Sequence, residues 1–115
     1  MKSQWASYQE EISNIKYFEK EFGFFAYSFP DKNTIYVEHV YVIPAERSKG
    51  RVRELMNEAD RIGRAADRNQ MLGLVKLNSK TCNESLRMHL ALGFNPCVAN
   101  ADEIWLSREI PLEGN

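Results

Sequence analysis

Apolar side chains near the start of the chain recur at intervals of three or four residues. They are Trp5, Tyr8, Ile12, Ile15 and Phe18. This interval is the period of one face of an α-helix. It predicts an amphipathic helix over about residues 3–20, and Gly23 then breaks the pattern.

Two stretches rich in aromatic and β-branched residues follow. Residues 24–29 (FFAYSF) and 34–43 (TIYVEHVYVI) have the composition of β-strands, and the residues between them (PDKN) favour a turn. Together they predict a hairpin. Pro44 ends the second strand, because its nitrogen has no hydrogen to donate to a neighbouring strand.

The middle of the chain combines a long helical pattern with a short apolar run. A helix is predicted over about residues 49–68 by the spacing of Val52, Leu55, Met56, Ala59, Ile62 and Ala66. Residues 71–77 (MLGLVKL) carry no charge before Lys76, which is typical of a strand buried on both faces. A strand, a helix and a further strand in this order predict a right-handed crossover and a parallel pair.

The last third of the chain predicts a short helix over residues 83–92 and two strands, over residues 94–98 and 103–110. Gly93 lies where helices commonly end in a left-handed conformation. No repeat or low-complexity segment interrupts the order of elements. We therefore expect one α/β domain over residues 1–115, built on a mixed, mostly antiparallel sheet with flanking helices.

Four basic residues surround Gly50, where the second strand gives way to the long helix. They are Arg47, Lys49, Arg51 and Arg53. The first N–H groups of a helix lack partners and the helix dipole adds positive potential, so this junction is suited to bind an anion such as phosphate. A solvated helix start is the alternative, although basic residues there oppose the dipole. The spacing is not that of a Walker loop.

Charge and composition narrow the range of functions. The net charge of −1 lacks the basic surplus of a nucleic-acid-binding protein, and no apolar run approaches the roughly 20 residues of a membrane span. Cys82 and Cys97 are too few for a disulfide scaffold, so we expect reduced thiols in a cytoplasmic protein. A zinc site that combines them with His39 and His89 has no supporting ligand spacing, so we predict no metal.

Two motifs resemble those of the GNAT superfamily of acyl-CoA-dependent N-acetyltransferases. The stretch YVIPAERSKGRV resembles motif A of that family, roughly V-x-P-x-x-R/Q-x-x-G-x-G/A. The residues in register are Val42, Pro44, Arg47 and Gly50. Downstream, CNESLRMHLALGFNPC resembles the fourth-helix motif of the family, which ends in Leu-Gly-Phe, here residues 92–94. The resemblance covers about residues 34–110 and implies a GNAT-like fold.

The resemblance also implies acetyl-CoA as co-substrate. Its pyrophosphate would be held by backbone amides of residues 48–52, and its pantetheine arm would lie between the strands at residues 34–43 and 71–77. The implied cofactor-binding residues are Val40, Tyr41, Val42, Arg47, Ser48, Lys49, Gly50, Arg51, Val52 and Asn83. Val52 departs from the family pattern, which has Gly or Ala at that position.

Acyl transfer to an amine needs a base for the ammonium proton and an acid for the departing thiolate. Glu38 lies where several family members carry a catalytic glutamate, and strand alternation would place it on one face with Val40 and Val42. Partial burial there would make it a better base; an exposed carboxylate paired with a lysine is the alternative. His39 is the weaker candidate for this base, because a single histidine on a strand is more often a structural hydrogen-bonding residue. His89 stands where the family often has a tyrosine that acts as the acid; a space-filling helix histidine is the alternative.

The function implied by the resemblance is transfer of an acetyl group from acetyl-CoA to a primary amine by direct attack. The alternative is a degenerate GNAT-fold module that binds a protein partner or a CoA-type ligand without catalysis. The N-terminal helix, within residues 1–22, would lie on the acceptor side, and Tyr27, Tyr36 and Tyr41 are candidates to line the acceptor pocket. A homodimer is compatible with the small core. Nucleic-acid and membrane partners are not expected.

Overall fold

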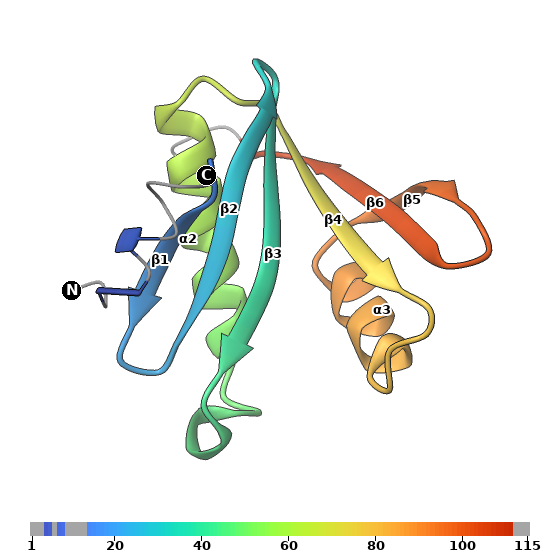
Figure 1. Cartoon of the computed structure of the whole chain (residues 1–115), viewed down its shortest axis with the longest axis horizontal. Helices are drawn as coiled ribbons and strands as arrows, with labels where there is room; N and C mark the ends of the chain where they lie inside the picture. The colour runs from blue at the N-terminus through green and yellow to red at the C-terminus, as the bar shows by residue number, and fades with distance from the viewer. Residues whose placement is uncertain (1–3, 6, 9–13, 112–115) are drawn as a thin grey trace.

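The computed structural model describes residues 4–5, 7–8 and 14–111. Its elements in chain order are β1 (Lys16–Lys20), β2 (Gly23–Asp31), β3 (Thr34–Val42), the 3-10 helix η1 (Pro44–Glu46), α2 (Arg51–Ala65), β4 (Gln70–Lys76), α3 (Cys82–Ala91), β5 (Asn95–Ala99) and β6 (Glu103–Glu109). The six strands form one sheet in the order β1-β2-β3-β4-β6-β5 (Figure 1). Within the described residues, no helix has the length and apolar character needed to cross a membrane.

Neighbouring strands are antiparallel throughout the sheet, except for β3 and β4. α2 connects these two strands, as the predicted crossover requires. Their parallel pairing is short, with residues 34–36 of β3 opposite residues 70–72 of β4. The predicted mixed, mostly antiparallel α/β fold is therefore confirmed, together with the hairpins β2–β3 and β5–β6.

The N-terminal segment differs from its prediction. Residues 4–5 and 7–8 are helical, but the helix predicted to reach residue 20 is wrong at its end, because Lys16–Lys20 form β1. Phe18 lies opposite Phe25 of β2, and the two rings stack at 5.3 Å. Pairing with β2 thus outweighs the local helical spacing. Residues 3, 6 and 9–13 of the predicted helix lie outside the described residues.

Both helices cover the same face of the sheet. α2 packs closely on β3, because a Cβ added at Gly63 of α2 would lie 3.3 Å from Ile35. α3 packs closely on β4, because a Cβ added at Gly73 of β4 would lie 2.7 Å from His89 of α3. Ile35 is the partner of Met71, which shares a face with Gly73. β4 was expected to be buried on both faces, but burial alternates along it, and the side chains on its other face are partly exposed.

An ion pair between Asp60 of α2 and Arg108 of β6 lies within this helix-covered face. Nη2 of Arg108 donates to Oδ1 of Asp60 at 2.7 Å, and the two side chains are 12% and 8% exposed, respectively. The Arg108 guanidinium also lies 5.3 Å from the centre of the Phe94 ring. A buried charge is costly unless it is paired, so this contact fixes where α2 crosses β6.

We expect Asp60→Ala to lower the free energy of unfolding by about 3–5 kcal/mol, because it leaves the Arg108 guanidinium buried without its partner. The matched control is Arg61→Ala, which removes an exposed pair with Glu58 and should cost less than about 1 kcal/mol. Urea unfolding followed by circular dichroism measures both. Equal, small effects of the two substitutions would contradict a stabilising role for the buried pair.

Candidate functional site

A cavity opens where β3 and β4 diverge. The strands are paired over residues 34–36 and 70–72 and then separate toward their C-terminal ends (Figure 1). The cavity has a volume of about 320 Å³. Its lining comes from β3, β4 and the start of α3: Tyr36, Glu38, His39, Leu74, Val75, Lys76, Ser79, Thr81, Cys82 and Ser85. A ligand in this cavity would therefore lie between the backbones of two separated strands.

An extra residue in β3 sets the direction of the side chains on this wall. Ala26 of β2 lies opposite Glu38, whereas Phe24 lies opposite Tyr41, so β3 has one more residue than β2 over this interval. His39 takes up the difference with a left-handed φ of 55°. This β-bulge shifts the alternation of faces beyond it.

The bulge corrects the expected orientation of Glu38. Val40 packs against the core and Val42 is buried in it, whereas Glu38 lines the cavity with Tyr36. The prediction that Glu38 shares a face with the two valines is wrong, because simple strand alternation does not continue through a bulge.

Glu38 and His39 are in contact on the cavity wall. Nε2 of His39 lies 2.9 Å from Oε1 of Glu38, and their side chains are 69% and 22% exposed. The carboxylate is therefore largely shielded from water, while the imidazole extends toward solvent. A shielded carboxylate next to an imidazole can accept a proton from a ligand and pass it outward. The structure thus brings together the stronger and the weaker candidate bases.

A row of backbone N–H groups faces no partner at the junction between β3 and α2. Gly50 precedes α2 in a left-handed conformation (φ 78°) and offers no side chain to cap the helix, and Ser48 is also left-handed (φ 63°). Across the described residues, the N–H groups of residues 48–53 donate to no protein acceptor. A cavity of about 220 Å³ lies beside them. Free amides at a helix start are the geometry that an anion site needs, and the sequence predicts such a site at this junction.

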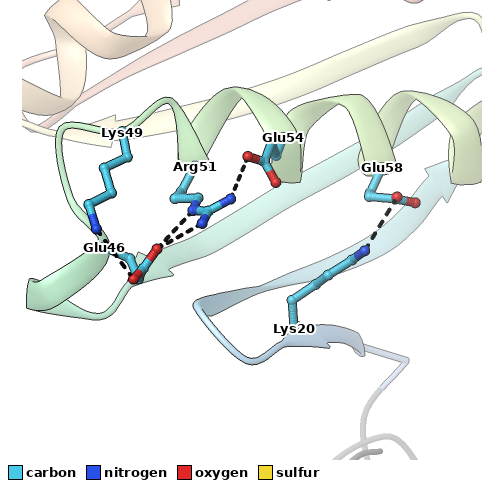
Figure 2. A network of polar contacts seen from close by, with 6 residues as sticks. All are labelled: Lys20, Glu46, Lys49, Arg51, Glu54 and Glu58. Atoms are coloured by element: carbon cyan, nitrogen blue, oxygen red, sulfur yellow. Dashed lines mark hydrogen bonds and ion pairs between the residues drawn. The ribbon is translucent and has the colours of Figure 1, made fainter.

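The basic side chains at this junction are mostly held by the protein itself. Glu46 lies between Lys49 and Arg51 (Figure 2). Its carboxylate is 3.6 Å from Nζ of Lys49 and 2.9 Å from Nη2 of Arg51, and Nη1 of Arg51 is 2.8 Å from Glu54. The hydrogen bond from Arg51, with the charge of Lys49, lowers the pKa of Glu46. Within the part of the chain that the structure describes, Arg53 has no such partner. Lys49 and Arg51 are thus balanced by Glu46 and Glu54, and the backbone amides, with the charges of Arg47 and Arg53, remain as the positive features of the junction.

Two further predicted cofactor residues connect this loop to β3. Nε of Arg47 donates to the Val42 carbonyl at 2.9 Å, and its guanidinium lies 5.6 Å from the centre of the Tyr41 ring. Val52 lines the cavity beside the loop and packs partly against the core. Arg47 therefore fixes the turn after β3, and the branched side chain of Val52 is accommodated mostly by the core.

The fourth-helix candidates lie apart from the cavity lining. His89 is partly buried, with Nδ1 donating to the Ser85 carbonyl at 2.7 Å and its ring edge-on to Phe94 at 5.0 Å. Asn83 is exposed, and the neighbouring Cys82 takes the position that lines the cavity. Within the stretch that resembles the fourth-helix motif, Cys82 and Ser85 line the cavity, whereas the two predicted site residues, Asn83 and His89, do not.

Tyr36 is the predicted acceptor-side tyrosine that the structure places on the cavity. Its ring centroid lies 5.6 Å from that of Trp105, a residue that the sequence did not single out. Burial, followed by the negative charges of Glu38 and Glu103, raises the pKa of Tyr36 to about 12. Tyr36 is therefore a protonated hydrogen-bond donor at neutral pH.

The chain belongs to the Acetyltransferase (GNAT) family, whose profile matches residues 4–94. No curated protein sequence matches it. Its fold is similar to that of a GNAT-family candidate acetyltransferase from Desulfovibrio desulfuricans, with a TM-score of 0.75 and 16% identity over 91% of this chain and 76% of the other.

Two similar structures contain the co-substrate or its product. One is a GNAT family acetyltransferase from Elizabethkingia anophelis with acetyl-CoA bound (TM-score 0.69, 15% identity, 93% of this chain and 83% of the other). The other is the PaiA N-acetyltransferase from Thermoplasma acidophilum in complex with coenzyme A (TM-score 0.71, 13% identity, 90% and 65%). Family and fold together support acyl-CoA-dependent acetyl transfer as the general class of activity.

We expect an alkaline titration of the near-ultraviolet absorbance to contain a component centred near pH 12, which Tyr36→Phe removes. Because the pKa of Tyr36 is higher in the folded than in the unfolded chain, its contribution to stability is complete below about pH 10 and is lost as the pH rises to about 12. Unfolding at several alkaline pH values tests this second point. An unchanged titration in the variant would contradict the assignment.

Proposed function

We propose that this protein transfers an acetyl group from acetyl-CoA to a primary amine by direct attack of the amine on the thioester. The observation that carries the proposal is that a cavity-lining carboxylate and a group of free amides lie along and just after one strand, β3. Glu38 and His39 line the cavity beside β4, and the unpartnered amides of residues 48–53 follow the end of the same strand. A long ligand with a phosphate group at one end and a reactive group at the other fits this arrangement.

The amides from Ser48 to Val52 are proposed to hold the pyrophosphate. Backbone donors and the positive end of α2 converge there, so the site does not depend on the basic side chains already paired with Glu46. The edge of β3 at Val40, Tyr41 and Val42 faces the gap left by β4 and is suited to pair with the amide groups of the pantetheine arm.

Glu38 is proposed as the general base. Its partial burial and its position on the cavity wall allow it to take the proton of an ammonium group, and His39 beside it provides a route for that proton to solvent. Bound acetyl-CoA supplies the acetyl group as an activated thioester, and the departing coenzyme A thiolate takes its proton from water. His89 is proposed to hold α3 against β4, because its Nδ1 proton is engaged by Ser85 and its ring packs on Phe94.

We expect Gly50→Asp to weaken acetyl-CoA binding at least about tenfold, because it puts a carboxylate beside the pyrophosphate. Gly50→Asn is the matched control, since it places a side chain of the same shape at the left-handed φ of 78° without the charge, and an added Cβ meets nothing within 4 Å. Isothermal calorimetry with each folded variant measures the affinities. If both variants bind like the parent chain, the anion site lies elsewhere; no binding by the parent chain at millimolar ligand would sink the proposal.

Glu38→Gln should lower kcat roughly 10²–10⁴-fold, because the amide cannot accept the ammonium proton, and should leave the KM for acetyl-CoA nearly unchanged. The control is Glu84→Gln, which removes a similar charge from an exposed position on α3. Thiol release from acetyl-CoA with a panel of amines gives both constants. Full activity in Glu38→Gln would move the base to another residue, and coenzyme A binding without turnover would favour a binding module without catalysis.

A further inference from the structure

The face of the sheet opposite the helices carries a second group of large side chains. Tyr36 lies opposite Leu72, and Leu74 lies opposite Trp105, so all four share this face. Leu72 and Leu74 are partly exposed, as are the two aromatic rings. Neither α2 nor α3 shields them, because both helices pack on the other face.

Val98 of β5 extends this group toward the edge of the sheet. It is the cross-strand partner of Trp105, and its side chain is 60% exposed. We call Tyr36, Leu74, Trp105 and Val98 the aromatic platform. Tyr36 and Leu74 also line the cavity between β3 and β4, so the platform and the cavity are continuous.

Two carboxylates lie at the same end of the aromatic platform. Glu38 follows Tyr36 by two residues on β3, and Glu103 precedes Trp105 by two residues on β6. β3 and β6 run in opposite directions, since β6 is antiparallel to β4 and β3 is parallel to it, so both glutamates lie toward the cavity end. Their charges also reach Tyr36, where both contribute to its raised pKa.

Glu103 is available to a ligand. Lys76 is its cross-strand partner but is exposed and, among the described residues, forms no ion pair with it. Glu38 contacts the exposed imidazole of His39, and its carboxylate remains part of the cavity wall. The platform therefore ends in the two carboxylates of Glu38 and Glu103, which outnumber the single ammonium of Lys76 on the same cavity wall.

We propose that the aromatic platform binds the acceptor and selects a primary ammonium ion attached to a flat, apolar group such as a phenyl ring. This inference rests on the proposed acetyl transfer and names its substrate class. The apolar group lies against Tyr36 and Trp105, and the ammonium points to Glu38 and Glu103 beside the cavity. Residues two apart on a strand are roughly 6.5–7 Å apart, which a ring with a two-carbon arm spans.

The carboxylates and the aromatic platform make the site selective for both the charge and the shape of the acceptor. Carboxylates and the faces of tyrosine and tryptophan attract cations, so the amine is favoured over a neutral or anionic analogue of the same shape. The apolar platform favours a ring or similar group over a short amine, because contact with it removes apolar surface from water. The same geometry directs the amine nitrogen to the base, which is where direct attack requires it.

The first test measures binding without turnover. Trp105 fluorescence is followed in the Trp5→Phe variant, in which it is the remaining tryptophan, with and without coenzyme A. We expect 2-phenylethylamine to bind about tenfold or more tightly than 2-phenylethanol or ethylamine, and 3-phenylpropionate to be bound least. Equal binding of the amine and the alcohol, or of phenylethylamine and ethylamine, would overturn the inference.

The second test assigns the site by calorimetry. Trp105→Leu and Val98→Ser should weaken the binding of 2-phenylethylamine several-fold and leave the binding of ethylamine unchanged. Glu103→Gln should reduce the preference for 2-phenylethylamine over 2-phenylethanol. Leu90→Ala, which removes exposed apolar surface from α3, is the control. Unchanged binding in Trp105→Leu, Val98→Ser and Glu103→Gln alike would overturn the inference. Selective amine binding without acetyl transfer would count against the proposed function alone.

Discussion

The short parallel pairing of β3 with β4 is the constraint on which the rest of this structure depends. Three residues of each strand are paired, at 34–36 and 70–72, and α2 joins the two strands. Longer pairing would close the gap between them and occupy the backbone edge of β3. Shorter pairing would leave the two halves of the sheet joined mainly through helices. The cavity, the exposed strand edge and the orientation of its wall all follow from where this pairing stops.

α2 keeps its position because polar contacts hold it along its length. Glu46 and Arg51 connect its start to the turn after β3, and Glu58 reaches Lys20 of β1 (Figure 2). Asp60 is paired with Arg108 of β6. The exposed contacts are individually weak, whereas the buried one is strongly position-dependent. Together with the apolar stripe of the helix, they keep its first amides fixed relative to the end of β3.

Much of the fold could be predicted from the sequence because hydrophobic spacing and turn residues are local signals. The β2–β3 hairpin, α2, α3 and the last two strands follow from them. β1 could not, since Lys16–Lys20 becomes a strand only by pairing with β2. At the site, Glu38 and the Gly50 loop were predictable as residue types in register. The bulge at His39 and the contact of Tyr36 with Trp105 were not, because both depend on how distant strands align.

The Gly50 loop presents main-chain N–H donors, and this determines which substitutions the loop tolerates. A backbone amide is the same group whichever side chain follows it, so replacements at Lys49, Arg51 or Val52 alter the surroundings of the loop and leave its donors in place. The left-handed turn is different, because few residues other than glycine adopt its φ of 78° without strain. The basic residues around Gly50 can therefore be replaced without loss of the backbone donors, whereas replacement of Gly50 strains the turn that positions them.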